Sequence, residues 1–266
     1  MRDARKSSPI GSVFQTRQGL FCLDPRDQIV TKALITRGEY GQAAINQILH
    51  LTSPEARVLL LGAHIGSIAI PLSKRVGKVC ALEANPQTFQ LLRINKQINE
   101  ADKLEIFPLA ANDKEETLEF VLNTTNSGGS KRMPLFRDEA YFSDQPETCQ
   151  VKATRLDGLF PDQKFEVIFM DIEGSEYFAM RGMPNLIAQA DVLISEFLPH
   201  HLLRVAGITL QQFLEPLEGF QTMIIPSQRK SCHAPDFERS LQAMMESGRG
   251  DDGLIFLKKK VTVKFS

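Results

Sequence analysis

Long hydrophobic runs and an excess of one charge are both missing from this sequence. No uninterrupted apolar segment approaches the roughly 20 residues that a membrane-spanning helix needs. The N-terminus, MRDARKSSPIGS, lacks the apolar core of a secretory leader. The formal net charge is −1, whereas a nucleic-acid-binding protein needs clustered Lys and Arg to neutralise phosphates. We therefore expect no membrane span and no nucleic-acid partner.

Cysteine is sparse and follows no pattern. The four cysteines are scattered and form no CxxC pair: Cys22, Cys80, Cys149 and Cys232. Isolated cysteines of this kind are typical of reduced thiols in a reducing compartment, and not of a disulfide framework or a zinc site. The sequence therefore predicts a cytoplasmic protein with four free thiols.

Two nucleotide-binding signatures are also absent. The pattern GxxxxGK[ST] does not occur, which excludes a P-loop at the level of sequence. The dinucleotide fingerprint GxGxxG is incomplete, because Gly62 and Gly66 are present with His64 between them but no third glycine completes the pattern. A pyrophosphate site is therefore only weakly indicated.

The segment from Val58 to Glu83 nevertheless has the pattern of a strand, a turn, a helix and a second strand. The apolar run VLLL is followed by a turn with Gly62 and Gly66 at its ends, and then by apolar residues at helical spacing. Glycines let a ligand approach the backbone, and a helix start offers N–H groups to an anion. Glu83 follows Gly62 by 21 residues, close to the offset of about 20 at which an acid binds a ribose diol.

Predicted strands and helices alternate through the rest of the chain, which indicates an α/β protein with a doubly wound, mostly parallel sheet. Ligands of such sheets bind beyond the carboxyl ends of the strands. Five residues fall at predicted strand ends and should meet in one crevice: Gly62, Glu83, Ala111, Asp171 and Glu196.

The chain of 266 residues suits one α/β domain with an extension. We expect residues 1–52 to form an N-terminal extension and helical cap, with an irregular stretch to about residue 20 and two helices after it. Residues 53–266 should form the main domain. For residues 123–150, which are rich in turn-forming and polar residues, a functional lid and a mobile loop are both open.

A ligand with one ribose and an amino-acid tail fits this layout better than a dinucleotide does. S-adenosylmethionine is such a ligand: its tail would lie over the glycine turn, its diol on Glu83 and its adenine beside Ala111 and Asn112. Asn85, which begins the helix after Glu83, and Asp171 are assigned to the same cofactor site.

Several motifs resemble the FkbM family of S-adenosylmethionine-dependent methyltransferases. They are LGAHIGS, LEANP, NSGGS, TRLDGLF before a strand, and MDIEGSEYFAMRGM, and together they extend from about Val58 to His200. DIEGSE followed by RGM is the most specific of them. The resemblance implies a Rossmann-like class I methyltransferase fold with a seven-stranded sheet whose last strand is antiparallel. It also implies methyl transfer, usually to an oxygen of a sugar or natural-product hydroxyl.

Carried over by position, the resemblance implies that the cofactor contacts Gly62, His64 and Gly66, with its ribose on Glu83 and its adenine on Asn112. The chain departs from the family at three places. Leu60 stands where members commonly have an acid, and His64 where they often have Asn. In EFLPHH, the histidine follows the acid later than in the usual pattern.

An alcohol that accepts a methyl group must lose its proton, so a base is expected within hydrogen-bond reach. Asp171, Glu173 and His200 are the candidates for this catalytic role. The acids of DIEGSE could instead hold a divalent metal ion that acidifies the hydroxyl. A metal is not favoured, because no His or Asn at ligand spacing accompanies them. The expected partner is a small hydroxylated acceptor, and a homodimer stays open.

Two other functions stay open at this point. A NAD-dependent oxidoreductase could use the same strand–turn–helix–strand unit, although a third glycine and a Tyr-x-x-x-Lys pair are absent. A non-catalytic binding protein on a decayed methyltransferase fold is the third alternative, and Leu60 and the displaced histidine are the features that favour it.

Overall fold

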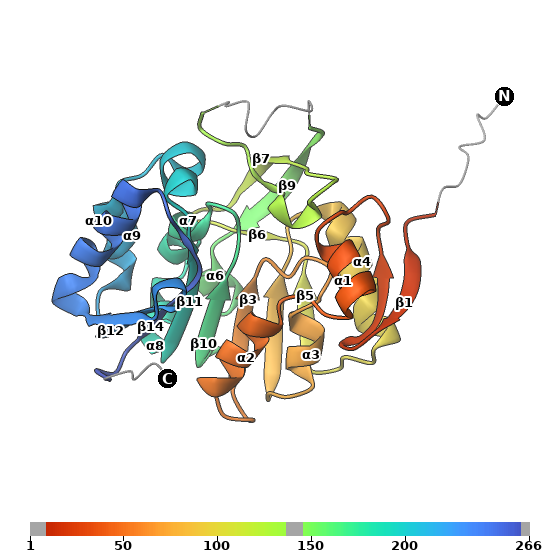
Figure 1. Cartoon of the computed structure of the whole chain (residues 1–266), viewed down its shortest axis with the longest axis horizontal. Coiled ribbons are helices and arrows are strands. Elements are labelled where there is room, and N and C mark those ends of the chain that lie inside the picture. Colours follow the sequence, from red (N-terminus) through yellow and green to blue (C-terminus); the bar gives the residue numbers. More distant parts are fainter. Residues whose placement is uncertain (1–8, 137–145, 262–266) are drawn as a thin grey trace.

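The centre of the protein is an eight-stranded sheet with the order β13-β12-β14-β11-β10-β3-β4-β5 (Figure 1). The structure is a computed structural model, and it describes residues 9–136 and 146–261. The strands are β3 (Arg57–Leu61), β4 (Lys78–Leu82), β5 (Leu104–Phe107), β10 (Val167–Met170), β11 (Val192–Phe197), β12 (Thr222–Ile225), β13 (Lys230–His233) and β14 (Asp251–Leu257). The five strands from β5 to β11 are parallel, whereas β14 runs antiparallel to both β11 and β12. This confirms the predicted seven-stranded sheet with an antiparallel last strand, to which β13 adds an unpredicted edge strand.

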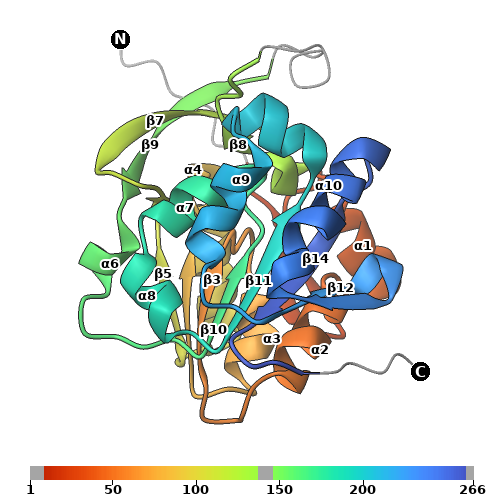
Figure 2. The same ribbon diagram turned by 90° about the vertical axis from the view of Figure 1, so that its left-hand side faces the viewer.

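Both faces of this sheet are covered by helices, because its strands are apolar on both sides. Leu59 and Leu61 pack into one buried cluster, and Val58 and Leu60 into the other. The first cluster lies under α6 (Leu156–Leu159), α7 (Glu176–Arg181), α8 (Pro184–Gln189), α9 (Leu210–Leu214) and α10 (Phe237–Ser247). The second lies under α1 (Val30–Arg37), α2 (Gln42–His50), α3 (Ala69–Ser73) and α4 (Pro86–Ile98). Figure 2 shows α6 and α8 on one side of the sheet and α2 and α3 on the other.

The N-terminal region is more ordered than its sequence suggests. The expected irregular stretch to about residue 20 is wrong for its second half, because β1 (Ser12–Thr16) and β2 (Gly19–Leu23) form an antiparallel hairpin. Asn95 on α4 accepts a hydrogen bond from the backbone N–H of Cys22 at 2.6 Å and donates one to its carbonyl at 3.2 Å. The side chain of Asn99, at the end of the same helix, makes the same pair of hydrogen bonds with the backbone of Leu20. The two side-chain amides thus complete the edge of β2. Residues 1–8 lie outside the described residues.

A second, four-stranded sheet is inserted between β5 and β10 and lies over the carboxyl ends of the central strands (Figure 1). Its order is β6-β9-β7-β8, from β6 (Ala110–Ala111), β7 (Glu116–Val121), β8 (Lys131–Arg132) and β9 (Thr148–Thr154). The predicted loop 123–150 is described only in part, because residues 137–145 lie outside the described residues.

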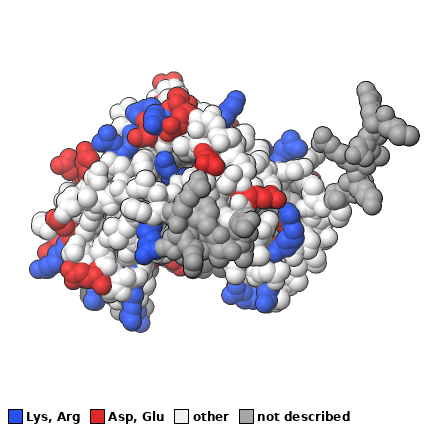
Figure 3. All heavy atoms as spheres, turned by 90° about the horizontal axis from the view of Figure 1, so that it is seen from above, with Lys and Arg blue, Asp and Glu red and all other residues white. Residues whose placement is uncertain are grey.

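Short helical turns complete the described chain. They are η1 (Ser127–Gly129), η3 (Glu215–Leu217), η4 (Pro226–Gln228), η5 (Ala234–Asp236) and the π-helix η2 (His201–Ala206). No helix among the described residues combines the length and apolar character needed to cross a bilayer. Positive and negative side chains are interspersed on the face seen from the side of the inserted sheet (Figure 3).

The turn after α7 gives a first prediction. A Cβ atom at Gly182 would overlap the carbonyl oxygen of Asn112, whereas nothing lies within 4 Å of a Cβ at Gly158 on α6. Gly182→Ala should therefore lower the free energy of unfolding by about 1–3 kcal/mol, because backbone must shift to make room. Gly158→Ala is the matched control and should raise it by about 0.4–1 kcal/mol. Urea denaturation measures the free energy of unfolding of both variants. Equal changes in the two variants would contradict the prediction.

Candidate active site

The main pocket of the described structure opens at the carboxyl ends of β3, β4 and β10. Its floor comes from the glycine turn and strand ends, its roof from the inserted sheet and the 126–130 segment, and one wall from Ile29, Val30 and Tyr40 of the N-terminal cap. The space between its atoms is about 1020 Å³, including the part open to solvent.

Glu83 holds the floor of this pocket together. Its side chain is 8% exposed, and its two carboxylate oxygens accept hydrogen bonds from the backbone N–H groups of His64 at 2.7 Å and Asn85 at 2.8 Å. Burial raises the pKa of Glu83, and these N–H donors partly oppose that rise. Each oxygen can accept a second hydrogen bond. The carboxylate therefore both closes the glycine turn and presents acceptor sites to the pocket.

The glycine turn uses most of its own donors within the protein. Gly62 and Ala63 donate to the carbonyl of Leu82, and Gly66 donates to that of Ala63. Gly62 has φ 88°, and a Cβ there would overlap the carbonyl oxygen of Asp171. The glycine thus lets β3 and β10 approach each other closely at the pocket floor.

His64 links the glycine turn to the loop above it. Its backbone lies in the left-handed region, with φ 50°, and its Nε2 is 2.7 Å from the hydroxyl oxygen of Ser127. The Ser127 hydroxyl donates to Asp27 at 2.6 Å, so the Nε2–H of a neutral His64 donates to Ser127. Burial lowers the pKa of His64 to about 4, against the opposing charge of Asp27. The imidazole is therefore neutral near pH 7.

Asp27 anchors this arrangement in the N-terminal cap. Its Oδ2 also accepts the backbone N–H of Ser127 at 2.8 Å. Its Oδ1 accepts the N–H groups of Ile29 at 3.0 Å and Thr31 at 2.9 Å at the start of α1. The Asp27–Ser127–His64 network thus ties together three segments that are far apart in the sequence, and it fixes the 123–130 loop over the pocket.

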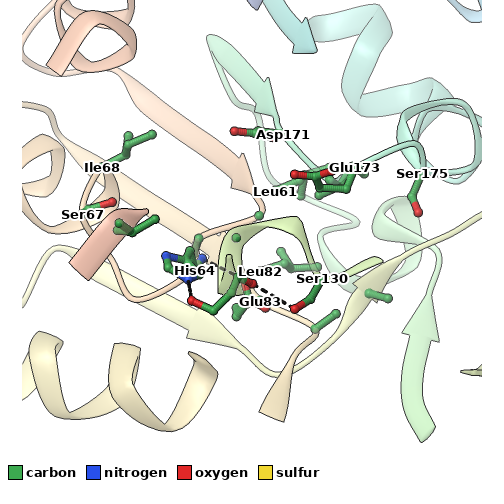
Figure 4. Close-up of a pocket in the computed structure, with 18 of the residues that line it drawn as sticks. Leu61, His64, Ser67, Ile68, Leu82, Glu83, Ser130, Asp171, Glu173 and Ser175 are labelled. Carbon is green, nitrogen blue, oxygen red and sulfur yellow. Dashed lines mark hydrogen bonds between the residues drawn. The ribbon is translucent and has the colours of Figure 1, made fainter. Parts of the chain in front are cut away.

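Acidic residues gather at the opposite end of the pocket from Glu83 and His64 (Figure 4). Asp171 directly follows β10, and its carboxylate has no hydrogen-bond or ion-pair partner among the described residues. Asp171 is exposed to the open pocket, but desolvation by the protein atoms around its carboxyl group raises its pKa to about 7, with further contributions from the negative charges of Glu173 and Asp252 and an opposing one from Lys131. This carboxyl group can therefore both hold and release a proton near neutral pH.

Glu173 is held by residues of two other segments. Its backbone has φ 56°, and its Oε2 lies 2.7 Å from the Nζ of Lys131 and 3.4 Å from the Nε2 of His201. His201 Nδ1 in turn lies 3.3 Å from Glu196 Oε2. Burial raises the pKa of Glu196 well above its usual value, and burial with the nearby Lys131 charge lowers that of His201 to about 2. These four side chains form what we call the Lys131 cluster.

The structure brings most of the predicted site residues into one pocket. Those that line it are Gly62, His64, Glu83, Ala111, Asp171 and Glu173. Glu196 does not line it but joins its acidic end through His201.

Four predicted residues are placed outside the pocket lining. Gly66, with φ 93°, packs against Ile70 and Leu92. Asn85 caps α4 and donates to Ser130 at 3.2 Å. The side chain of Asn112 donates to Glu116 at 2.8 Å. His200 is exposed, with its ring 4.3 Å from that of His201.

Several pocket residues were not predicted. Ser127 and Ser130 fall within the NSGGS motif, so that motif was the signal for them. Tyr40 of the lining and Lys131, which contacts the lining residue Glu173, carry no comparable signal, because each belongs to a segment whose sequence shows no pattern typical of a binding site. Their roles become visible only when the cap and the inserted sheet are placed over the strand ends.

The Asp27–Ser127–His64 network makes a second prediction. Ser127→Ala removes the hydroxyl that joins Asp27 to His64, so it should lower the free energy of unfolding by about 1–3 kcal/mol. It should also speed amide hydrogen exchange across residues 123–130. Thr125→Ala is the matched control, because the Thr125 hydroxyl is exposed and donates only to Asn123. Equal exchange rates in the two variants would show that the network does not fix the loop.

The fold and pocket can now be compared with known proteins. Among solved structures, the chain is similar to an rRNA methylase from Streptococcus thermophilus, with 8% identity over 82% of this chain and 95% of that one and a TM-score of 0.47. It is also similar to a putative O-methyltransferase from Klebsiella pneumoniae, with 12% identity over 89% and 91% of the two chains and a TM-score of 0.45. A search of curated protein sequences gave no match.

The decisive comparison is with protein families. The Methyltransferase FkbM domain matches residues 61–242, a span that contains the glycine turn, Glu83, the NSGGS loop and the acids after β10. Asp27 and Tyr40 lie before it. Because the match covers more than half of the chain and includes the floor and acidic end of the pocket, the chain belongs to the FkbM family of methyltransferases, whose methyl donor is S-adenosylmethionine.

Proposed function

We propose that this methyltransferase methylates a hydroxyl oxygen of a small molecule, such as a sugar or a natural product, in the pocket between Glu83 and Asp171. The observation that carries the proposal is the polarity of that pocket. One end has a buried carboxylate with spare acceptor capacity, and the other has a carboxyl group whose pKa is raised to about 7. The first suits a ribose diol, and the second suits a proton acceptor.

The lining residues fit the cofactor. Glu83 can accept hydrogen bonds from the ribose hydroxyls while it keeps its two backbone donors. Leu109, Ala111 and Phe120 offer apolar surface for an adenine ring. Asp171 and Glu173 supply negative charge beside a cationic sulfonium. When bound, S-adenosylmethionine supplies an electrophilic methyl group.

Asp171 is the base that we favour. Methyl transfer to a hydroxyl would form an oxygen–methyl bond, break the methyl–sulfur bond of the cofactor and leave S-adenosylhomocysteine, and an Asp171 oxygen would accept the hydroxyl proton. A base works best when its pKa lies near the working pH, and desolvation by the surrounding protein together with nearby negative charges brings the pKa of Asp171 to that range. Glu173 is less suited, because it is ion-paired with Lys131. His200 is also less suited, because it lies outside the pocket lining.

The pocket walls have two further tasks in this proposal. The cap and the NSGGS loop restrict the access of water to the pocket, and they orient the two reactants. Orientation alone can contribute on the order of 7–11 kcal/mol to lowering the barrier. The Asp27–Ser127–His64 network contributes by holding the NSGGS loop in place over the pocket.

A third prediction concerns the cofactor. Glu83→Ala should weaken the binding of S-adenosylhomocysteine by about tenfold or more, equivalent to ~1.4 kcal/mol, because hydrogen bonds to a charged acceptor are lost. Glu83→Gln keeps one strong acceptor, so its affinity for S-adenosylhomocysteine should lie between those of the unmodified protein and Glu83→Ala. Glu105→Gln, which removes an exposed carboxylate from β5, is the control and should bind normally. Isothermal titration calorimetry measures all three, and unchanged affinity in Glu83→Ala would contradict the assignment.

The same calorimetry separates the alternative enzyme class. Titration with NAD should give no binding, whereas a NAD-dependent oxidoreductase would bind NAD and not S-adenosylhomocysteine.

A fourth prediction concerns the base. Asp171→Asn should lower kcat/KM by about 10²–10⁴-fold, the usual contribution of general base catalysis. In the unmodified enzyme, kcat/KM should rise with pH through about 7, because Asp171 accepts a proton only when ionised. This rise of kcat/KM with pH should be absent in Asp171→Asn. Transfer of tritium from labelled cofactor to a mixed pool of sugars and polyketide-like alcohols supplies the assay.

Two outcomes would count against the proposal. If the unmodified protein binds the cofactor but transfers to no class of acceptor, a non-catalytic binding protein is the better interpretation. If Asp171→Asn keeps the same pH profile, Asp171 is not the base.

A further inference from the structure

The Lys131 cluster contains a set of atoms that could coordinate a cation. Ligand atoms of Glu173, Glu196 and His201 all lie within 4.8 Å of one another. Two carboxylates and an imidazole are ligands that divalent transition metals accept. By donor type alone, this is a plausible metal site at the acidic end of the pocket.

A protein cation already lies among these atoms. The Nζ of Lys131 is 2.7 Å from Glu173 Oε2 and 3.2 Å from His201 Nε2. Both distances are those of hydrogen bonds that an ammonium donates. Lys131 therefore occupies the lone pair of His201 Nε2 and one acceptor site of Glu173, which are the positions between the two side chains where a metal ion would bind.

The imidazole of His201 connects Lys131 to Glu196 through hydrogen bonds that run in one direction. Since His201 Nε2 accepts from Lys131, its proton is on Nδ1, which faces Glu196 Oε2 at 3.3 Å. The ammonium thus orients His201, and His201 orients Glu196. A metal ion on Nε2 would impose the same tautomer, so the lysine reproduces its effect on both neighbours.

The ammonium of Lys131 is held stably in this position because the cluster is buried. The side chains of Lys131 and His201 are 10% and 6% exposed, and a buried ammonium requires anionic and hydrogen-bonding partners. Lys131 lies on β8, where it pairs with Val121 of β7. Its side chain therefore reaches from the inserted sheet to the end of the central sheet, and it joins the roof of the pocket to Glu173.

We propose that Lys131 is the resident cation of this cluster: it takes the position of a divalent metal ion, holds the Glu173 side chain beside the reacting end of the pocket, and excludes metal from the cluster. Lys131 is a positioning residue that acts through Glu173. If Lys131 has this role, methyl transfer needs no metal in this cluster, and that consequence rests on the proposed function. The expected exclusion of metal ions from the cluster does not rest on it.

The test is titration of the full-length protein with Mn²⁺, followed by calorimetry and electron paramagnetic resonance. The unmodified protein should show no His201-dependent site. Lys131→Ala should gain one Mn²⁺ site that is at least about 100-fold tighter, and Lys131→Ala combined with His201→Ala should lose it. Lys152→Ala, an exposed lysine of β9 in the same inserted sheet, is the matched control and should gain nothing.

A measurement on the unmodified protein keeps the inference testable if Lys131→Ala does not fold. The ¹⁵N spectrum of its imidazoles should show His201 with its proton on Nδ1, and added Mn²⁺ should leave that signal unbroadened. Selective broadening, or a folded Lys131→Ala protein that gains no site, overturns the inference.

Activity separates this inference from the proposed function. A chelator such as EDTA should leave methyl transfer unchanged, and a loss of transfer that Mn²⁺ restores would overturn the inference. If no acceptor is methylated at all, the proposed function fails, whereas the Mn²⁺ titration still decides the role of Lys131.

Discussion

The hydrogen bonds that Glu83 accepts from the backbone of His64 and Asn85 are the constraint on which the pocket depends. They fix the glycine turn after β3, the end of β4 and the start of α4 relative to one another. A buried carboxylate that lacked these donors would carry the full cost of desolvation. Because the donors satisfy it, the charge can remain at the pocket floor, where its remaining lone pairs are available to a ligand.

The pocket is built from two halves with different electrostatic character. Near Glu83, a neutral His64 and the serine hydroxyls of the NSGGS loop surround a single carboxylate. At the other end, desolvation raises the pKa of both Asp171 and Glu196, and the nearby charge of Glu173 raises both further. The ammonium of Lys131 opposes this repulsion and keeps the acidic end compact. A cationic methyl donor would therefore lie between a hydrogen-bonding end and a charge-bearing end.

Much of the architecture follows from local sequence pattern. The apolar strands, the glycine turn and the spacing of Glu83 predict the parallel sheet and its crevice, because hydrophobic periodicity is a local property. The prediction was wrong for the hairpin of β1 and β2, whose edge is completed by Asn95 of α4 and by Asn99, the residue that follows α4. No local pattern reveals such a partner, since these hydrogen bonds join residues more than 70 positions apart.

The sequence by itself determined the family, the alternation of strands and helices along the chain and the acids at the strand ends, because each of these depends on neighbouring residues. Only the tertiary structure decided which side chains complete the site. Ser127 meets Asp27 across 100 residues, and Lys131 meets Glu173 across 42. It also placed His201, and not His200, inside the acidic cluster. Consecutive residues in a helical turn point in different directions, and only the packing of that turn selects which of the two is buried.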